Sequence, residues 1–402
     1  MQSHCRRAAK GRLKGSSLLG MGSLAVAGLL AASGTFAGAS STVGPKAAHA
    51  TGHGANLALV KSQLAAATKP LSFIVPGPAF NAKKLAGKTV FNMPSDTADP
   101  FYTPITQAMQ QAANAAHLKL ITFANQGTTS EWVQGMDQAI SQHVGAIVLG
   151  GIDPAVIAPQ IKEAEAHHIV VEESHEYQKG VKTPSILSGN SFGAFAQAAH
   201  LMADYAIAKT SGHAHVLIIT DNAYPNSVTM YDSMVSTFKS ECGSGCTVTA
   251  VNEPITNWAS GIQPAVESAL TSNPNINWVL PVYDSMSEYI VPGIEAKGAA
   301  SKVSVASFNG TPFVLKYIED PSSDQGIVKM DAGENTALIG WQAIDQSMRL
   351  MEGLPAAPND TTAIRIFDGS NVRLTGTPPA LGKGYGPASY ITGFEKLWGY
   401  AK

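Results

Sequence analysis

Two kinds of hydrophobic pattern alternate along the chain from residue 88 onward. Short apolar runs rich in β-branched residues predict strands at 88–93, 118–124, 146–150, 169–172, 215–220, 247–251, 278–282, 303–308 and 327–330. Between them, apolar positions that recur every three or four residues predict helices at 104–117, 131–143, 155–167, 192–210, 228–240, 260–271 and 289–297. Such alternation is typical of parallel sheets built from right-handed strand–helix–strand units.

The alternation falls into two blocks, 88–172 and 192–330. Each block is long enough for one α/β lobe with helices on both faces of a sheet, so the chain is predicted to fold as two doubly wound parallel-sheet lobes. Ligands of such sheets bind beyond the carboxyl ends of the strands. Residues 51–87, which include Pro76-Gly77-Pro78, are interpreted as a leader helix or linker before the first strand.

Aromatic and short polar side chains follow the predicted strands. The candidate ligand-binding residues are Asp99, Phe101, Tyr102, His175, Asn222, Trp258, Tyr283, Asp284, Asn309 and Asp331. Rings can stack on a ligand while amides and carboxylates bind its hydroxyl groups, so this set is suited to a polar molecule with apolar faces.

Several candidates have a structural alternative. Phe101 and Tyr102 could belong to a core, although the preceding Asp-Pro favours a loop, and Trp258 is balanced between site and packing. The polar candidates also fit other roles: a loop histidine for His175, a helix N-cap for Asp284, a turn for Asn309 and a hinge surface for Asp331.

The first fifty residues have the pattern of an export signal. Basic residues at the start are followed by an apolar run from Leu18 to Ala32 and then by small residues. We interpret 1–50 as a secretory signal peptide, with a retained membrane anchor as the alternative. Gly34 stands where a bacterial lipoprotein would carry its lipidated cysteine. The protein is therefore expected in the periplasm or on the extracellular side of a bacterial membrane.

Two cysteines remain after that segment, Cys242 and Cys246, in a short Gly-rich loop. In an oxidising compartment this pair predicts a disulfide. The alternative is a metal site, but no neighbouring His or third Cys completes a ligand set. We expect no metal and no cofactor.

Composition and motifs narrow the function. The net charge is −2 and charged residues make up 14% of the chain, so no basic excess indicates a nucleic-acid partner. Phosphate-binding glycine loops, nucleophile elbows and histidine-rich metal spacings are absent from the sequence. Catalysis is therefore not expected, and neither is a DNA-binding regulator.

Three motifs resemble one protein family. Asp99-Pro100-Phe101-Tyr102 is similar to its Asn-Pro-Phe-aromatic segment after the first strand. The stretch 305–312, Val-Ala-Ser-Phe-Asn-Gly-Thr-Pro, is similar to its strand ending in Gly-Phe-Asp-Gly-Thr-Pro, and 278–286 matches its apolar strand before an acidic helix start. Residues 88–353 thus resemble the periplasmic sugar-binding proteins of ribose-binding type, the substrate-binding subunits of ABC importers.

The resemblance implies a sugar or polyol ligand, an ABC transporter permease as partner and a monomeric protein. The family's Asp-Arg pair after the fourth strand is replaced here by Ser174-His175-Glu176, and its Arg after the next strand falls near Thr229. Without arginine an anionic ligand lacks its usual partner, so we expect a neutral or weakly cationic ligand. A flatter aromatic ligand, and a role as receptor subunit for a signalling partner, remain alternatives.

The resemblance also implies a multi-strand hinge and lobes assembled from separate segments. We assign 88–189 with 332–360 to the N-terminal lobe and 190–331 with 361–402 to the C-terminal lobe.

Overall fold

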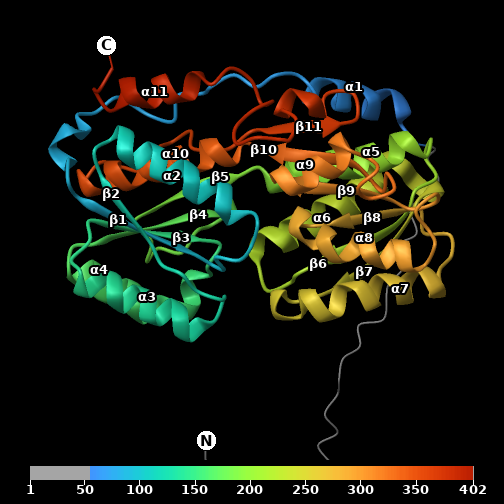
Figure 1. Ribbon diagram of the computed structural model, residues 1–402, viewed down its shortest axis with the longest axis horizontal. Helices are drawn as coiled ribbons and strands as arrows, with labels where there is room; N and C mark the ends of the chain where they lie inside the picture. Colours follow the sequence, from blue (N-terminus) through green and yellow to red (C-terminus); the bar gives the residue numbers. More distant parts are fainter. Residues whose placement is uncertain (1–54, 402) are drawn as a thin grey trace, which may run out of the picture. The chain divides into compact units, whose positions relative to one another are not determined.

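The computed structural model describes residues 55–401, so the predicted signal peptide, residues 1–50, lies outside the described residues. Within 55–401 the chain forms two separate sheets, each covered by helices on both faces (Figure 1). This is the predicted α/β architecture of two doubly wound lobes.

The first lobe contains a five-stranded sheet in the order β2-β1-β3-β4-β5, and every pairing is parallel. The strands are β1 (Thr89–Pro94), β2 (Lys119–Thr122), β3 (Ala146–Gly150), β4 (Val170–Gln178) and β5 (Gly189–Gly193). One face is covered by α2 (Tyr102–Ala115) and α10 (Thr336–Met351), and the other by α3 (Thr129–Ser141) and α4 (Ala158–Ala166) (Figure 1). Buried apolar side chains form a separate core on each face.

The second lobe contains a six-stranded sheet in the order β11-β10-β9-β8-β6-β7, parallel except between β10 and β11. The strands are β6 (His215–Thr220), β7 (Thr247–Asn252), β8 (Trp278–Pro281), β9 (Ser304–Asn309), β10 (Val328–Glu334) and β11 (Ile364–Asp368). The helices are α5 (Phe195–Lys209), α6 (Pro225–Thr237), α7 (Gln263–Ser272), α8 (Ser287–Ala296) and α9 (Pro312–Glu319).

The two sheets share one strand order. In each, the first strand lies between the second and the third, as β1 lies between β2 and β3 and β6 between β7 and β8. The chain therefore leaves the first strand toward one edge of the sheet and the third strand toward the opposite edge. This reversal opens a crevice at the carboxyl ends of these strands. Crevices of this kind are the usual binding places of doubly wound sheets.

Between β5 and β11 the chain crosses between the lobes three times. The chain enters the second lobe between β5 and α5, returns between β10 and α10, and enters the second lobe again before β11. Near the first and third crossings, the backbone N–H of Phe192 donates to Asp360 O, and the N–H of Thr362 donates to Phe192 O.

The structure moves one lobe boundary and reassigns the C-terminal segment. We predicted that the second lobe begins at 190, but 189–193 forms β5, which pairs with β4 in the first sheet. We placed 361–402 wholly in the second lobe, but α11 (Ser389–Leu397) packs in the first-lobe core through Phe394. There the indole of Trp398 stacks on that of Trp341 at a centroid distance of 5.4 Å.

The leader segment is packed along both lobes. Helix α1 (Leu57–Ala67) lies against α5 and β11, with Val60 fully buried in the second-lobe core. Farther along, the backbone N–H of Leu71 donates to Tyr385 O, and that of Phe80 donates to Leu397 O. The leader segment and the C-terminal segment therefore run side by side (Figure 1). Among residues 55–401, no helix combines the length and apolar character needed to cross a membrane.

Candidate functional site

A cavity lies where the carboxyl ends of both sheets meet. Its lining residues are Ser95, Asp99, Phe101, Tyr102, Gly151, His175, Glu176, Phe195, Tyr224, Asn226, Ile255, Trp258, Tyr283, Ser285 and Asn309. The empty space amounts to about 460 Å³ including the mouth. The enclosed space is therefore suited to a small ligand.

The first wall follows β1 and the start of α2. The carboxylate of Asp99 accepts the backbone N–H of Phe101 at 2.9 Å, which fixes the turn that places Phe101 and Tyr102 at the cavity. Their rings are 5.1 Å apart, edge to face. A Cβ on Gly151, which has a φ of +66°, would overlap the Tyr102 hydroxyl, so the glycine after β3 makes room for this ring.

A bulge in β4 supplies the next two residues. The pairing of β4 with β5 shifts register between Ser174 and Tyr177, and His175 has a left-handed φ of +76°. The two extra residues of β4, His175 and Glu176, turn into the cavity, as bulged residues beside functional sites often do. The imidazole of His175 lies 5.1 Å from the Phe101 ring and 4.9 Å from the Phe195 ring.

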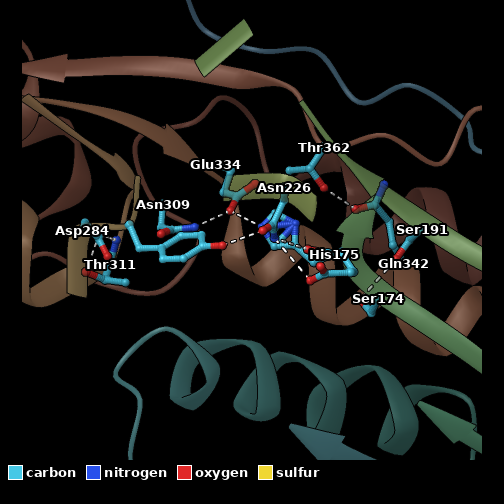
Figure 2. Close-up of polar contacts among 12 residues, drawn as sticks. Ser174, His175, Ser191, Asn226, Asp284, Asn309, Thr311, Glu334, Gln342 and Thr362 are labelled. Atoms are coloured by element: carbon cyan, nitrogen blue, oxygen red, sulfur yellow. Dashed lines mark hydrogen bonds and ion pairs between the residues drawn. The ribbon is translucent and has the colours of Figure 1, made fainter. Parts of the chain in front are cut away.

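The second lobe contributes rings and an oriented amide. The Oδ1 atom of Asn226 accepts the Tyr283 hydroxyl and the N–H of Ser227, so its Nδ2 atom points toward the first lobe. There Nδ2 lies 3.4 Å from His175 O (Figure 2) and 3.4 Å from Glu176 Oε2. The Trp258 ring lies 6.0 Å from that of Tyr283, and its indole N–H donates to Glu253 O at 3.0 Å.

Hydrogen bonds connect the lobes around the cavity. The Ser285 hydroxyl of the second lobe donates to Asp99 Oδ1 of the first at 2.8 Å. At the hinge, Glu334 Oε1 accepts the Asn309 amide at 2.9 Å and forms a hydrogen bond with His175 Nε2 (Figure 2). His175 therefore connects the cavity to the end of β10, where the chain returns to the first lobe.

Burial dominates the electrostatics of the site. It raises the pKa of Asp99, and it raises the pKa of Glu176 well above its usual value, with added repulsion from Glu173, Asp153 and Asp221. Burial also lowers the pKa of His175 to about 3, so this imidazole is neutral at physiological pH. The lining contains no Lys or Arg.

Seven of the ten predicted binding residues line this cavity: Asp99, Phe101, Tyr102, His175, Trp258, Tyr283 and Asn309. Phe101 and Trp258 are only 6% and 7% exposed and pack in the cores of different lobes, yet each keeps an edge at the cavity. These two rings therefore pack in a core, as the structural alternative has it, and also line the cavity.

The other three lie outside the lining. Asn222 is exposed in the turn after β6. Asp284 is fully buried and accepts both the N–H and the hydroxyl of Thr311, at 2.8 and 2.6 Å. Asp331 is fully buried and accepts the Ser307 hydroxyl at 2.8 Å. Both carboxyls hold second-lobe segments together instead of facing the cavity.

Eight lining residues were missed from the sequence: Ser95, Gly151, Glu176, Phe195, Tyr224, Asn226, Ile255 and Ser285. Tyr224 and Asn226 follow the predicted strand 215–220, as Asn222 does, but the turn points Asn222 outward. Glu176 lies beyond the predicted end of its strand, and only the bulge brings it inward. The signal for it was a run of polar residues, 172–176, directly after an apolar strand.

Two further groups lie away from the cavity. Cys242 and Cys246 lie close together, with Cα atoms 5.9 Å apart, a spacing that suits a disulfide. His200, Asp204 and Glu241 lie together, with His200 Nε2 3.4 Å from Asp204 Oδ2, and offer three atoms that could coordinate a cation. None of these five residues lines the cavity.

Solved structures share the fold. An ABC transporter solute-binding protein from Agrobacterium vitis with bound allitol matches with a TM-score of 0.63 and 18% identity, over 72% of this chain and 98% of that one. One from Burkholderia graminis C4D1M in complex with D-arabinose gives 0.61 and 21%, over 71% and 96%. One from Bacillus halodurans C-125 with bound myo-inositol gives 0.60 and 16%, over 73% and 98%.

No curated protein matches the sequence significantly. The model of the periplasmic binding protein domain matches residues 90–355, which is more than half of the chain and includes both sheets except β11 and Thr89, the first residue of β1. The chain therefore belongs to the family of periplasmic binding protein domains.

Proposed function

We propose that this protein is an extracytoplasmic solute-binding protein that captures a sugar or polyol between its lobes and delivers it to the permease of an ABC importer. The observation that carries the proposal is the cavity itself, because strand ends of both lobes supply rings and short polar side chains to one small space. A ligand held there touches both lobes, and contacts with both stabilise the closed form.

The size and lining of the cavity support a small polyhydroxy compound. Rings such as those of Tyr102 and Trp258 can stack on the apolar face of a sugar, while Asp99, Asn226 and Asn309 offer partners for hydroxyl groups. The similar solute-binding proteins bind allitol, D-arabinose and myo-inositol.

A thermal-shift screen against pentoses, hexoses, alditols and inositols tests the binding proposal. Because a ligand that binds only the folded state raises its stability, at least one compound should raise the melting temperature in a concentration-dependent way. Isothermal titration should then give one site per chain. If every compound left the melting temperature unchanged at millimolar concentration, the sugar or polyol assignment would be wrong.

Delivery to an importer is tested in cells. Deleting the gene should abolish high-affinity uptake of the radiolabelled ligand, and restoring it should recover uptake. Normal uptake together with a lost transcriptional or chemotactic response would favour a receptor subunit for a signalling partner. We also propose that the protein is not an enzyme, so NMR should show the ligand unchanged after prolonged incubation. We further propose that it acts as a monomer.

Export through the segment 1–50 and a disulfide between Cys242 and Cys246 belong to the same proposal, because disulfides persist in oxidising compartments. Replacing Cys242 by Ser should lower the free energy of unfolding by about 2 kcal/mol under oxidising conditions, the value for a short loop. The same substitution measured in reducing buffer is the control. Equal melting temperatures of the two proteins under oxidising conditions would contradict the disulfide.

A further inference from the structure

The charge of the cavity is unbalanced. Asp99 and Glu176 contribute two carboxyl groups to the lining, whereas Lys and Arg contribute none. The one basic side chain in the lining is His175, which burial keeps neutral and which is hydrogen-bonded to Glu334. A charged carboxylate in this space therefore has no positive partner in the surrounding described residues.

Of the two carboxyl groups, that of Glu176 has fewer hydrogen-bond partners, and its side chain is fully buried. Its Oε1 atom has no hydrogen-bond partner among the described residues, and its Oε2 atom has only the Asn226 amide at 3.4 Å. Buried carboxylates are normally paired with a cation or with several donors. The neighbouring carboxyl group of Glu173 accepts the N–H groups of Gly151 and Glu176. It repels a negative charge on Glu176 and does not compensate for it.

The walls around these carboxyls are aromatic. Rings in the lining come from Phe101, Tyr102, Phe195, Tyr224, Trp258 and Tyr283. The faces of such rings carry partial negative charge and attract organic cations, most strongly when the site is desolvated. Rings that enclose a space together with an unpaired carboxylate are the usual surroundings of a bound ammonium group.

We propose that the ligand carries a protonated amine, so that it is an amino sugar or amino polyol whose ammonium group is bound beside Glu176. This inference rests on the proposed function and makes its ligand class narrower. The ammonium donates to Glu176 Oε1 and contacts the ring faces, and the hydroxyl groups of the ligand are left for Asp99, Asn226 and Asn309. The alternative is that Glu176 stays protonated and donates its proton to a neutral sugar hydroxyl.

Isothermal titration of the purified protein at pH 7.5 with matched pairs separates the two. Each pair differs by one group: D-glucose and D-glucosamine, D-galactose and D-galactosamine, and D-glucitol and 1-amino-1-deoxy-D-glucitol. We expect the amine of at least one pair to bind at least about tenfold more tightly than its hydroxyl partner. Its neutral N-acetyl derivative should lose that advantage.

The outcomes distinguish the two proposals. Equal or tighter binding of the hydroxyl member in every pair that binds overturns the amine inference and leaves sugar or polyol capture intact. Binding of no member of any pair, together with a negative screen of neutral sugars and polyols, contradicts the proposed function and the inference with it.

The variant Glu176→Gln tests the residue itself, because it keeps the shape and removes the negative charge. It should lower the affinity for the preferred amine at least about tenfold and change the affinity for the neutral partner far less. Glu165→Gln, an exposed position on α4, is the matched control and should change neither. An unchanged amine preference in a folded Glu176→Gln protein would overturn the assignment, and the wild-type comparison decides the ligand class even if this variant does not fold.

Discussion

The two lobes share a strand order but use the acidic residues at their strand ends differently. In the first lobe, Asp99 and Glu176 line the cavity. In the second lobe, Asp284 and Asp331 are fully buried, and the Oδ2 atom of each accepts hydrogen bonds, from Thr311 and Ser307 respectively, that stabilise the packing between strand ends. The comparison teaches that the fold determines where side chains gather, whereas the local demand for hydrogen-bond acceptors determines which of them remain free for a ligand.

Asp221 follows the same division. Its carboxylate accepts the N–H of Ala223 at 3.1 Å and that of Ile255 at 2.8 Å, so it holds together the loops after β6 and β7. Those loops in turn place Tyr224 and Ile255 at the cavity. The second-lobe acids thus support the site from behind, while the rings, amides and hydroxyls of that lobe face it.

The largest effect should come from removing a structural acid. Asp284→Ala leaves the N–H and hydroxyl of Thr311 unpaired in a buried place, which should lower the free energy of unfolding by about 3 kcal/mol. Urea denaturation measures this value. Glu176→Gln is the comparison and should cost far less stability, because Glu176 has only one long hydrogen bond to its side chain. Equal losses in the two variants would remove the distinction between the lobes.

The buried histidine of the first lobe should make stability depend on pH. Its folded-state pKa of about 3 lies below the unfolded value of about 6.5, so its contribution is present above pH 6.5 and is lost as the pH falls toward 3. Between pH 6.5 and 5 this amounts to roughly 1.5 kcal/mol. Burial raises the pKa of its partner Glu334, and that group acts in the opposite direction as the pH falls.

The difference between wild type and His175→Gln therefore isolates the histidine. Chemical denaturation at several pH values should show that the variant loses less stability on acidification than the wild type. Parallel curves would mean that folding does not lower the pKa of His175.

Trp258 tests whether the second lobe contributes to binding through a ring. Trp258→Ala should weaken binding of the ligand identified by the screen by about 1–2 kcal/mol, the usual loss for a stacking anchor. Trp258→Phe, which keeps a ring, should recover part of that loss in the same titration. Unchanged affinity in the alanine variant would leave Trp258 with a packing role alone.

The smallest effect should come from the hydrogen bond between Ser285 and Asp99. Ser285→Ala removes a contact between the lobes and should weaken ligand binding by about 1 kcal/mol, because the closed form becomes less populated. Ser260→Ala, outside the lining, is the control. Small-angle X-ray scattering should show that the ligand-free variant is no more compact than the ligand-free wild-type protein. A more compact variant would contradict this role.

Much of the fold followed from the sequence, because strands such as β3 and β6 are nearly continuous apolar runs bounded by turns. β5 did not, since Gly189–Gly193 contains one large apolar residue and is defined by its pairing with β4. The segment 361–402 was assigned to the second lobe as a whole, and its helix α11, which packs in the first-lobe core, was not predicted, because a pattern of apolar positions shows which face is buried and not against which partner.

The site was predictable to a smaller extent. The position after a strand indicated Tyr102, Trp258 and Tyr283, but Glu176 depends on a register shift that no periodicity shows. Asn222 and Asp284 have the same position relative to their strands as true lining residues, and they differ only in the direction imposed by the turn.

A crystal structure of the protein with the tightest-binding compound from the screen tests the central claim most directly. We predict density between the lobes, in contact with Tyr102 and Glu176 from the first and with Trp258 and Asn226 from the second. A ligand that touches one lobe only, or that occupies a different part of the molecule, would contradict the account.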